Sequence, residues 1–160
     1  MSDVGPVAPT DEDLLRAIRS LILAAERLRQ NQAAIHDVGV SELLALEHLY
    51  YDGKLTPGEL GARLGLSSGT MTALVDRLES AGYAARTPNP DDRRSQLVRI
   101  SETGSATMGS LYAGFAGSAQ RTLAEMPGST RHALVDALFA LAADVDGYAA
   151  SLIDAPREAD

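Results

Sequence analysis

The fold is decided by residues 60–75, which read LGARLGLSSGTMTALV. Two short apolar helical patterns meet here across a turn of a few residues. Gly61 supplies a small residue where the two helices must cross closely, and Gly65 can adopt the positive φ that ends the first helix. The shared core would consist of Leu60, Leu64, Leu66, Met71, Leu74 and Val75. The stretch therefore predicts a helix-turn-helix.

The second helix of this pair begins with small residues, most of which carry a hydroxyl group. They are Ser67, Ser68, Gly69, Thr70 and Thr72. A surface helix without a partner would more often carry Glu and Lys at these positions. Short side chains at a helix N-terminus allow close approach to phosphates and base edges, which favours a DNA-reading role. An ordinary αα-hairpin in a helical bundle remains the alternative when this hairpin is considered alone.

A two-stranded ribbon is predicted directly after this helix, from residues 83–87 and 96–101. The loop between the strands carries the paired arginines Arg93 and Arg94, whose burial would be costly. A loop that projects beside a recognition helix would place an arginine in the neighbouring minor groove, where the potential is most negative. The ribbon therefore favours a winged helix-turn-helix that binds DNA.

Two acidic residues, Asp91 and Asp92, precede these arginines. In one interpretation they only solvate a turn. In the other, Asp92 pairs with Arg86 or Arg94 and stiffens the tip of the wing. The sequence leaves both interpretations open.

Two further helix starts precede the helix-turn-helix. Ser41 is expected to cap a helix that ends at Asp52. Thr56 is a strong N-cap, because Pro57 follows it at the first helical position and Glu59 can reach back to it.

Both ends of the chain carry long amphipathic helices. Residues 10–36 begin with a capping box of Thr10 and Asp13, and residues 103–153 contain two more helices separated at Pro127. The first helix spans roughly 35 Å at 1.5 Å per residue, which is too long for a small domain to cover. The predicted fold is mainly α with a small β-wing. Its segments are a disordered lead (1–9), dimerisation helices (10–36 and 103–153), a winged helix-turn-helix (41–101) and a tail (154–160).

Composition narrows the function further. The chain of 160 residues has a net charge of −8, which at first argues against a nucleic-acid partner. However, residues 54–101 carry seven basic and five acidic residues, a surplus of +2, so the rest of the chain carries −10.

The absence of cysteine excludes disulfides, thiol redox sensing and thiolate metal sites. No apolar stretch reaches the roughly 18 residues of a membrane span, and the acidic N-terminus is unlike a secretory signal, so we expect a cytoplasmic protein.

The sequence offers little support for catalysis. The three histidines, His36, His48 and His132, do not form an i, i+4 pair on one helix, so no metal site is expected. No glycine-rich phosphate loop, nucleophile elbow or paired-carboxylate motif is present. We therefore expect no enzyme and no cofactor.

The wing sequence is the most specific motif in the chain. Residues 89–95 read NPDDRRS, and residues 98–104 read VRISETG. These runs resemble the wing of the MarR family of bacterial regulators, which typically reads Asp-Pro-x-Asp-Arg-Arg and continues into a strand ending Leu-Thr-x-x-Gly. Asn89, Ile100 and Ser101 stand where that pattern has Asp, Leu and Thr.

The resemblance implies a homodimeric, sequence-specific transcriptional regulator that binds a pseudo-palindromic duplex through two winged readers. It would be a repressor that a small-molecule ligand relieves. The residues that it places against the major groove and its phosphates are Ser67, Ser68, Thr70 and Thr72. It places Arg77 at a backbone phosphate, Arg94 or Arg93 in the minor groove, and Arg86 with Asp92 as braces of the wing. Ala73 stands where many relatives have a long polar or basic residue, which predicts sparse base readout.

Two matters stay open at this level. MarR-like proteins commonly bind small aromatic or anionic effectors in a crevice, where this chain offers His36, Tyr50, Tyr51 and Tyr112. Core packing explains the tyrosines equally well, so no ligand-binding residue is assigned. The acidic total also leaves a second class of function, a winged-helix protein–protein interaction module that does not bind DNA.

Overall fold

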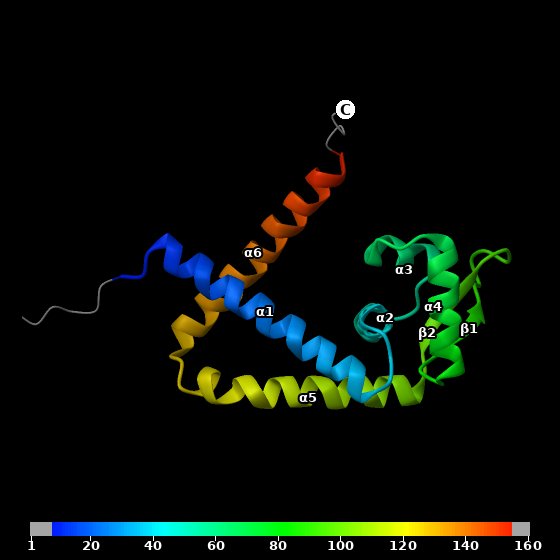
Figure 1. Cartoon of the computed structure of the whole chain (residues 1–160), viewed down its shortest axis with the longest axis horizontal. Coiled ribbons are helices and arrows are strands. Elements are labelled where there is room, and N and C mark those ends of the chain that lie inside the picture. Colours follow the sequence, from blue (N-terminus) through cyan, green and yellow to red (C-terminus); the bar gives the residue numbers. More distant parts are fainter. Residues whose placement is uncertain (1–7, 155–160) are drawn as a thin grey trace, which may run out of the picture. The chain divides into compact units, whose positions relative to one another are not determined.

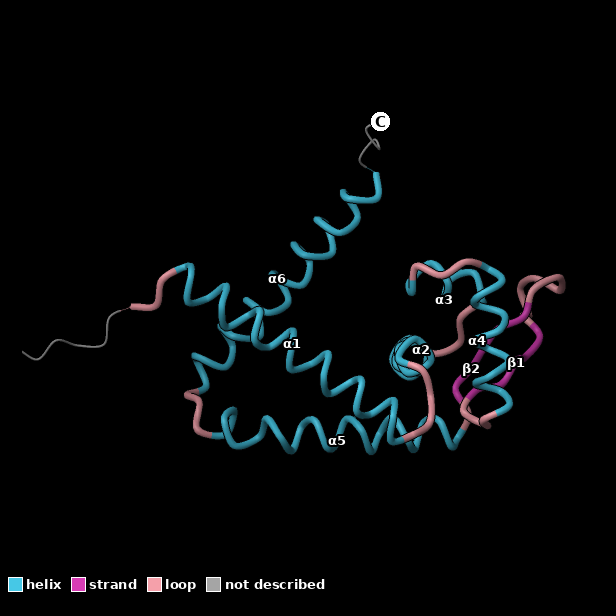
Figure 2. Tube along the Cα trace, in the orientation of Figure 1, coloured by secondary structure: helices cyan, strands magenta, loops and turns pink. Residues whose placement is uncertain are grey.

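The computed structural model describes residues 8–154, which fold into six helices and one antiparallel pair of strands (Figure 1). The elements are α1 (Asp11–Ile35), α2 (Val40–Asp52), α3 (Pro57–Leu64), α4 (Ser68–Ser80), β1 (Ala84–Pro88), β2 (Gln96–Ile100), α5 (Glu102–Ala124) and α6 (Gly128–Asp154). The predicted fold class, mainly α with a small β-wing, is confirmed (Figure 2). The chain divides into two compact units after Tyr112. Residues 1–7 of the predicted lead and 155–160 of the predicted tail lie outside the described residues.

The core of the first unit is formed by α2, α3, α4 and the strands, which gather on one side of Figure 1. Of the residues predicted for the shared core, the fully buried ones are Leu60, Met71, Leu74 and Val75. Leu64 and Leu66 are partly buried against them. Leu46 and Leu49 of α2 complete the interior. The periodicity of apolar residues therefore identified the core correctly.

Local signals set the ends of the central helices. Thr56 caps α3: its Oγ1 accepts the Glu59 N–H at 3.2 Å, and Glu59 accepts the Thr56 N–H at 2.7 Å. Gly65 ends α3 with a φ of +64°, in the left-handed region that favours glycine. A Cβ on Gly61 would lie 3.2 Å from the Leu66 carbonyl oxygen, so the close helix crossing needs this glycine. Both glycine predictions are confirmed.

The predicted cap of α2 is wrong. The helix begins at Val40 with Gly39 as its N-cap, which leaves Ser41 inside the helix. The side chain of Glu42 reaches back from the third helical position and accepts the N–H of the N-cap residue Gly39.

The ribbon pairs Ala84 with Ile100 at its base and Pro88 with Gln96 toward its tip. Its strands agree with the predicted runs to within one residue. The Oγ of Ser101 donates to the Gly82 carbonyl at 2.6 Å and accepts the Gly104 N–H at 3.0 Å. This glycine lies so close to the Tyr83 carbonyl oxygen that a Cβ there would overlap it. The start of α5 is therefore held tightly against the base of the wing.

The long helices at the chain ends bury few of their apolar residues. Thr10 and Asp13 form the predicted capping box of α1. The exposed apolar residues of α1 are Leu14, Leu15, Leu21, Ile22, Leu28 and Ile35. Those of α6 are Val135, Leu138, Phe139, Val145, Tyr148 and Leu152. No helix within residues 8–154 has the length and apolar content that crossing a membrane requires.

Candidate nucleic-acid interface

The exposed start of α4 is built from hydroxyl side chains that also cap the helix. Ser67 is the N-cap: its Oγ accepts the Thr70 N–H at 3.3 Å and lies 2.9 Å from the Thr70 Oγ1. The Oγ1 of Thr72 donates to the Ser68 carbonyl at 3.0 Å. All four predicted hydroxyl residues are exposed. The helix N-terminus, with its partial positive charge, is therefore open to solvent.

The rest of α4 is two-sided. Met71, Leu74, Val75 and Leu78 face the core and are buried. The exposed residues of the helix are Ser68, Gly69, Thr70, Thr72, Ala73, Asp76, Arg77 and Ser80. The buried face fixes the orientation of the helix, and the exposed face carries only short side chains over its first two turns.

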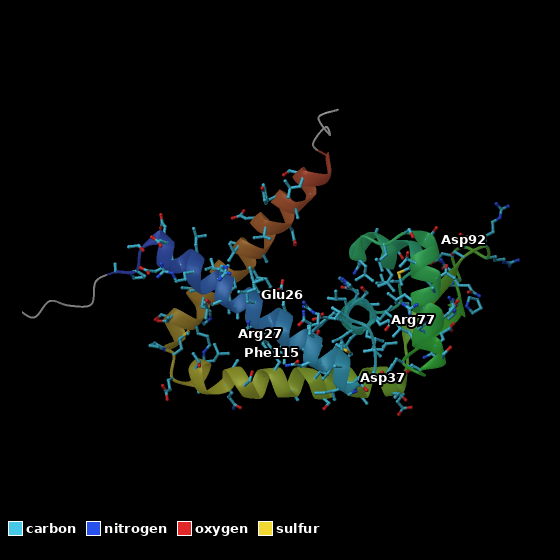
Figure 3. The ribbon with its side chains drawn as sticks, viewed as in Figure 1. Glu26, Arg27, Asp37, Arg77, Asp92 and Phe115 are labelled. Atoms are coloured by element: carbon cyan, nitrogen blue, oxygen red, sulfur yellow. The ribbon has the colours of Figure 1, made fainter. Side chains whose placement is uncertain are left out.

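An open groove joins α4 to the wing. Its lining residues are Thr56, Pro57 and Gly58 at the start of α3, Thr72 of α4, and the wing residues Arg86, Asn89, Asp92, Arg93, Arg94, Ser95 and Gln96. The groove therefore contains one predicted helix residue together with both predicted wing arginines. Ser68 lies in a smaller depression that it shares with Thr72. Arg77 lines neither depression. Figure 3 labels Arg77 on α4 and Asp92 on the wing, at separate places.

Arg86 ties the wing to α4. Its guanidinium pairs with Asp76 at 2.7 Å and with Glu79, and its backbone N–H donates to Glu79 at 2.7 Å. Burial alone would lower the pKa of Arg86, but these two carboxylates raise it above its ordinary value. The proposed pairing of Arg86 with Asp92 is therefore wrong, because the carboxylates of α4 occupy the guanidinium. The contact still braces the wing.

Asp92 acts within the tip of the wing. Its carboxylate accepts the backbone N–H of Arg94 at 2.9 Å, and its carbonyl oxygen accepts the N–H of Ser95 at 3.0 Å. Asn89 adds a hydrogen bond of 2.8 Å from its amide to the Ser95 hydroxyl. These bonds close the turn through the backbone, whereas an Asp92–Arg94 ion pair was one of the expected means. The side chains of Arg93 and Arg94 remain exposed.

Arg77 has a partner that the sequence reasoning missed. Its Nε donates to the carboxylate of Glu42, which is the residue that also accepts the Gly39 N–H. The Glu42 side chain is 10% exposed and that of Arg77 is 60% exposed. The pair joins α4 to the start of α2. The only signal available in the sequence was an acidic residue near a helix start, which does not identify a partner 35 residues away.

Three tyrosines form a second cluster in the first unit, within reach of Glu47. The ring centroids of Tyr50 and Tyr112 lie 5.5 Å apart, and those of Tyr51 and Tyr112 lie 4.9 Å apart. The Tyr112 hydroxyl donates to Glu47 at 2.8 Å, and Arg29 lies 3.9 Å from the same carboxylate. Burial, with hydrogen bonds to Tyr51 and Glu47, raises the pKa of Tyr112 well above its ordinary value.

The histidines do not join this cluster. His36 is the C-cap of α1, and His48 contacts Asp52 at 3.3 Å on α2. Within the described part of the chain, no three His, Asp or Glu side chains are grouped as a metal site requires.

Comparison with known proteins finds relatives for the central part of the chain. Residues 36–95 match the family model described as MarR family. The chain is 47% identical over 70 residues to the HTH-type transcriptional regulator YcgE of Bacillus subtilis (strain 168), a match that covers 42% of this chain and 46% of that one. It is 33% identical over 81 residues to the multiple antibiotic resistance protein MarR of Salmonella typhimurium, covering 51% and 56%. The chain thus spans about half the length of these curated relatives.

Solved structures share the fold over more of the chain. RV1404 from Mycobacterium tuberculosis has a TM-score of 0.70 at 21% identity, covering 86% of this chain and 96% of that one. The MepR–DNA complex of S. aureus has a TM-score of 0.57 at 16% identity, covering 79% and 98%. Identities this low establish a common fold. Together with the family match, they confirm the resemblance that the wing sequence suggested.

Proposed function

The winged helix-turn-helix of this chain belongs to the MarR family, and we propose that the chain is a transcriptional regulator that binds double-stranded DNA sequence-specifically in the cytoplasm. One observation carries the proposal: Thr72 and both wing arginines line one open groove beside the start of α4. A helix N-terminus attracts phosphate, and an arginine on a projecting loop fits a minor groove. The fold is that of a protein solved in complex with DNA.

We propose that the active form is a homodimer. The exposed apolar residues of α1 and α6 support this, because soluble chains rarely leave such stripes in water. A two-fold dimer would present two readers, and its operator would be pseudo-palindromic with half-sites about one helical turn apart.

The regulatory direction that we propose is repression relieved by a small aromatic or anionic effector. The tyrosine cluster supports this, because it offers aromatic surfaces, and Arg29 lies 3.9 Å from the Glu47 carboxylate that Tyr112 contacts. Benzoate is a suitable probe, since it combines a ring with a carboxylate. We expect millimolar benzoate to weaken operator binding, and unchanged binding would argue against an aromatic anion as effector.

A salt titration of DNA binding tests the central proposal. Fragments from the region upstream of the protein's own gene would be titrated by fluorescence anisotropy at several salt concentrations. Arg94→Ala is expected to weaken binding on the order of tenfold and to reduce the salt slope by about 1, because a groove contact rich in phosphate is lost. Arg99→Ala is the matched control, since it removes an exposed arginine of the same ribbon that lies outside the groove.

Two outcomes would contradict the proposal in different ways. Unchanged affinity and slope in Arg94→Ala would reject the role of the wing. Failure to bind any duplex would instead favour a protein–protein interaction module, which the net charge of −8 would suit.

A further inference from the structure

We propose that α4 recognises thymine through its C5-methyl group, with Ala73 as the residue that determines this specificity. The inference rests on the proposed DNA-binding function and states which base feature that function reads. It comes from what the exposed face of α4 carries and from how its few polar groups are engaged.

The exposed face of α4 lacks the side chains that usually read purines. Guanine is read by the forked or long cations of Arg and Lys, and adenine by the amides of Asn and Gln. The helix contains no Lys, Asn or Gln, and its one arginine is Arg77. The Nε of that arginine is bonded to Glu42, which holds the side chain toward the start of α2.

Ala73 lies at the centre of the outward stripe. Positions 69, 73, 76 and 80 follow the helical repeat on the face opposite the buried Leu74 and Leu78. Gly69 has no side chain, so the first turn can approach base edges closely. Asp76 is held by Arg86 at 2.7 Å. The methyl group of Ala73 is therefore the main feature that this stripe offers to a base.

The hydroxyl groups of Thr70 and Thr72 already have partners at the start of the helix. Thr72 donates its hydroxyl proton to the Ser68 carbonyl, and the Thr70 hydroxyl is shared with Ser67. A threonine bonded in this way still has a methyl group available for apolar contact. Alanine and threonine methyl groups are suitable contacts for the thymine methyl, which is the major-groove feature that distinguishes thymine from uracil.

The test uses DNA in which one atom group is changed at a time. A duplex selected by the full-length protein from a random library would carry uracil in place of each thymine in turn. We expect about a fourfold loss of affinity at one or two positions in each half-site, because one buried methyl group is removed. In the matched arm, 7-deazaguanine replaces each guanine, which removes the N7 acceptor, and we expect no change in affinity.

Ala73→Gly connects the effect to the residue. This variant is expected to bind the thymine and uracil duplexes equally well at the sensitive position, while Ala73→Ser, which keeps the Cβ, retains the preference. Circular dichroism would verify that both variants are folded; the uracil scan itself needs no variant.

The failures can be distinguished. Binding that is indifferent to uracil but weakened by 7-deazaguanine, or by N4-methylcytosine opposite Asp76, overturns the thymine inference alone. A protein that selects no duplex overturns the proposed function, and the inference with it.

Discussion

The winged helix-turn-helix and the long end helices use the same apolar residues in opposite ways. In the first region Leu46 is 1% exposed, whereas Leu15 of α1 is 67% exposed and Phe139 of α6 is 74% exposed. The central helices α2, α3 and α4 have 13, 8 and 13 residues and cover one another. Helices α1 and α6 have 25 and 27 residues, and within the described chain much of their apolar surface stays open. One region completes its core alone, whereas the other leaves apolar surface that the proposed dimer would cover.

The largest expected effect is on the core. Leu46→Ala should lower the free energy of unfolding by about 2–5 kcal/mol, because it leaves a cavity among fully buried side chains. Leu15→Ala is the matched substitution in α1 and should act through association of subunits, so its effect should vary with protein concentration. Urea unfolding at several protein concentrations measures both. A concentration-independent loss of similar size at Leu15 would show that α1 is buried within one chain.

The next effect concerns the end helices. Phe139→Asp should weaken self-association about 30-fold or more, because it places a charge in an apolar contact surface. Analytical ultracentrifugation measures the change in dissociation constant. Thr103→Asp adds the same charge at an exposed position in the first turn of α5 and should leave association unchanged. If Phe139→Asp associates as the wild type does, α6 is not part of the dimer interface.

Ion pairs also differ between the winged helix-turn-helix and the end helices. Glu42→Gln should lower the free energy of unfolding by about 1–3 kcal/mol, because Glu42 joins the α2 start to Arg77 in a largely buried place. Glu12→Gln breaks an exposed pair of 2.8 Å with Arg16 on α1 and should change stability by less than about 1 kcal/mol. Thermal and urea unfolding would compare the two variants. Equal effects would mean that Glu42 acts only as a surface charge.

The smallest effect involves the two capping boxes. Thr56→Ala should cost about 1 kcal/mol of global stability through loss of the N-cap, whereas Thr10→Ala should mainly fray the start of α1. Hydrogen bonds from the Thr56 backbone and hydroxyl lower the pKa of Glu59. Because the pKa of Glu59 is lower in the folded chain than its ordinary value of 4.5, the ionised carboxylate stabilises the fold at pH values above 4.5. This stabilisation disappears as the pH falls through the lowered pKa.

Urea unfolding of wild type and Thr56→Ala between pH 3 and pH 7 would follow this loss. The difference between the two should shrink as pH falls below about 4.5. The backbone N–H of residue 56 remains in both proteins, so a difference that stays constant over this range would show that the Thr56 hydroxyl does not contribute to the lowered pKa of Glu59.

The sequence predicted what depends on near neighbours. The cap at Thr56, the helix start near Ser67 and the left-handed turn at Gly65 follow from residues within a few positions, and the apolar repeat identified the core. The missed features depend on tertiary contacts. Spacing alone does not show that Arg86 faces α4 instead of Asp92, nor that Glu42, remote in sequence, meets Arg77. The sequence shows which residues carry opposite charges, but it does not show which of them lie close enough in the fold to pair.

In the proposed complex with DNA, the Arg86 clamp affects how tightly the groove holds a duplex. One guanidinium joins two carboxylates of α4 to the first strand of the ribbon, which restrains the hairpin relative to the helix. A freely hinged hairpin would lose conformational entropy each time it settled on a ligand. We expect the clamp to remove part of that freedom when the chain folds, which would leave more of the contact energy to hold the proposed DNA ligand.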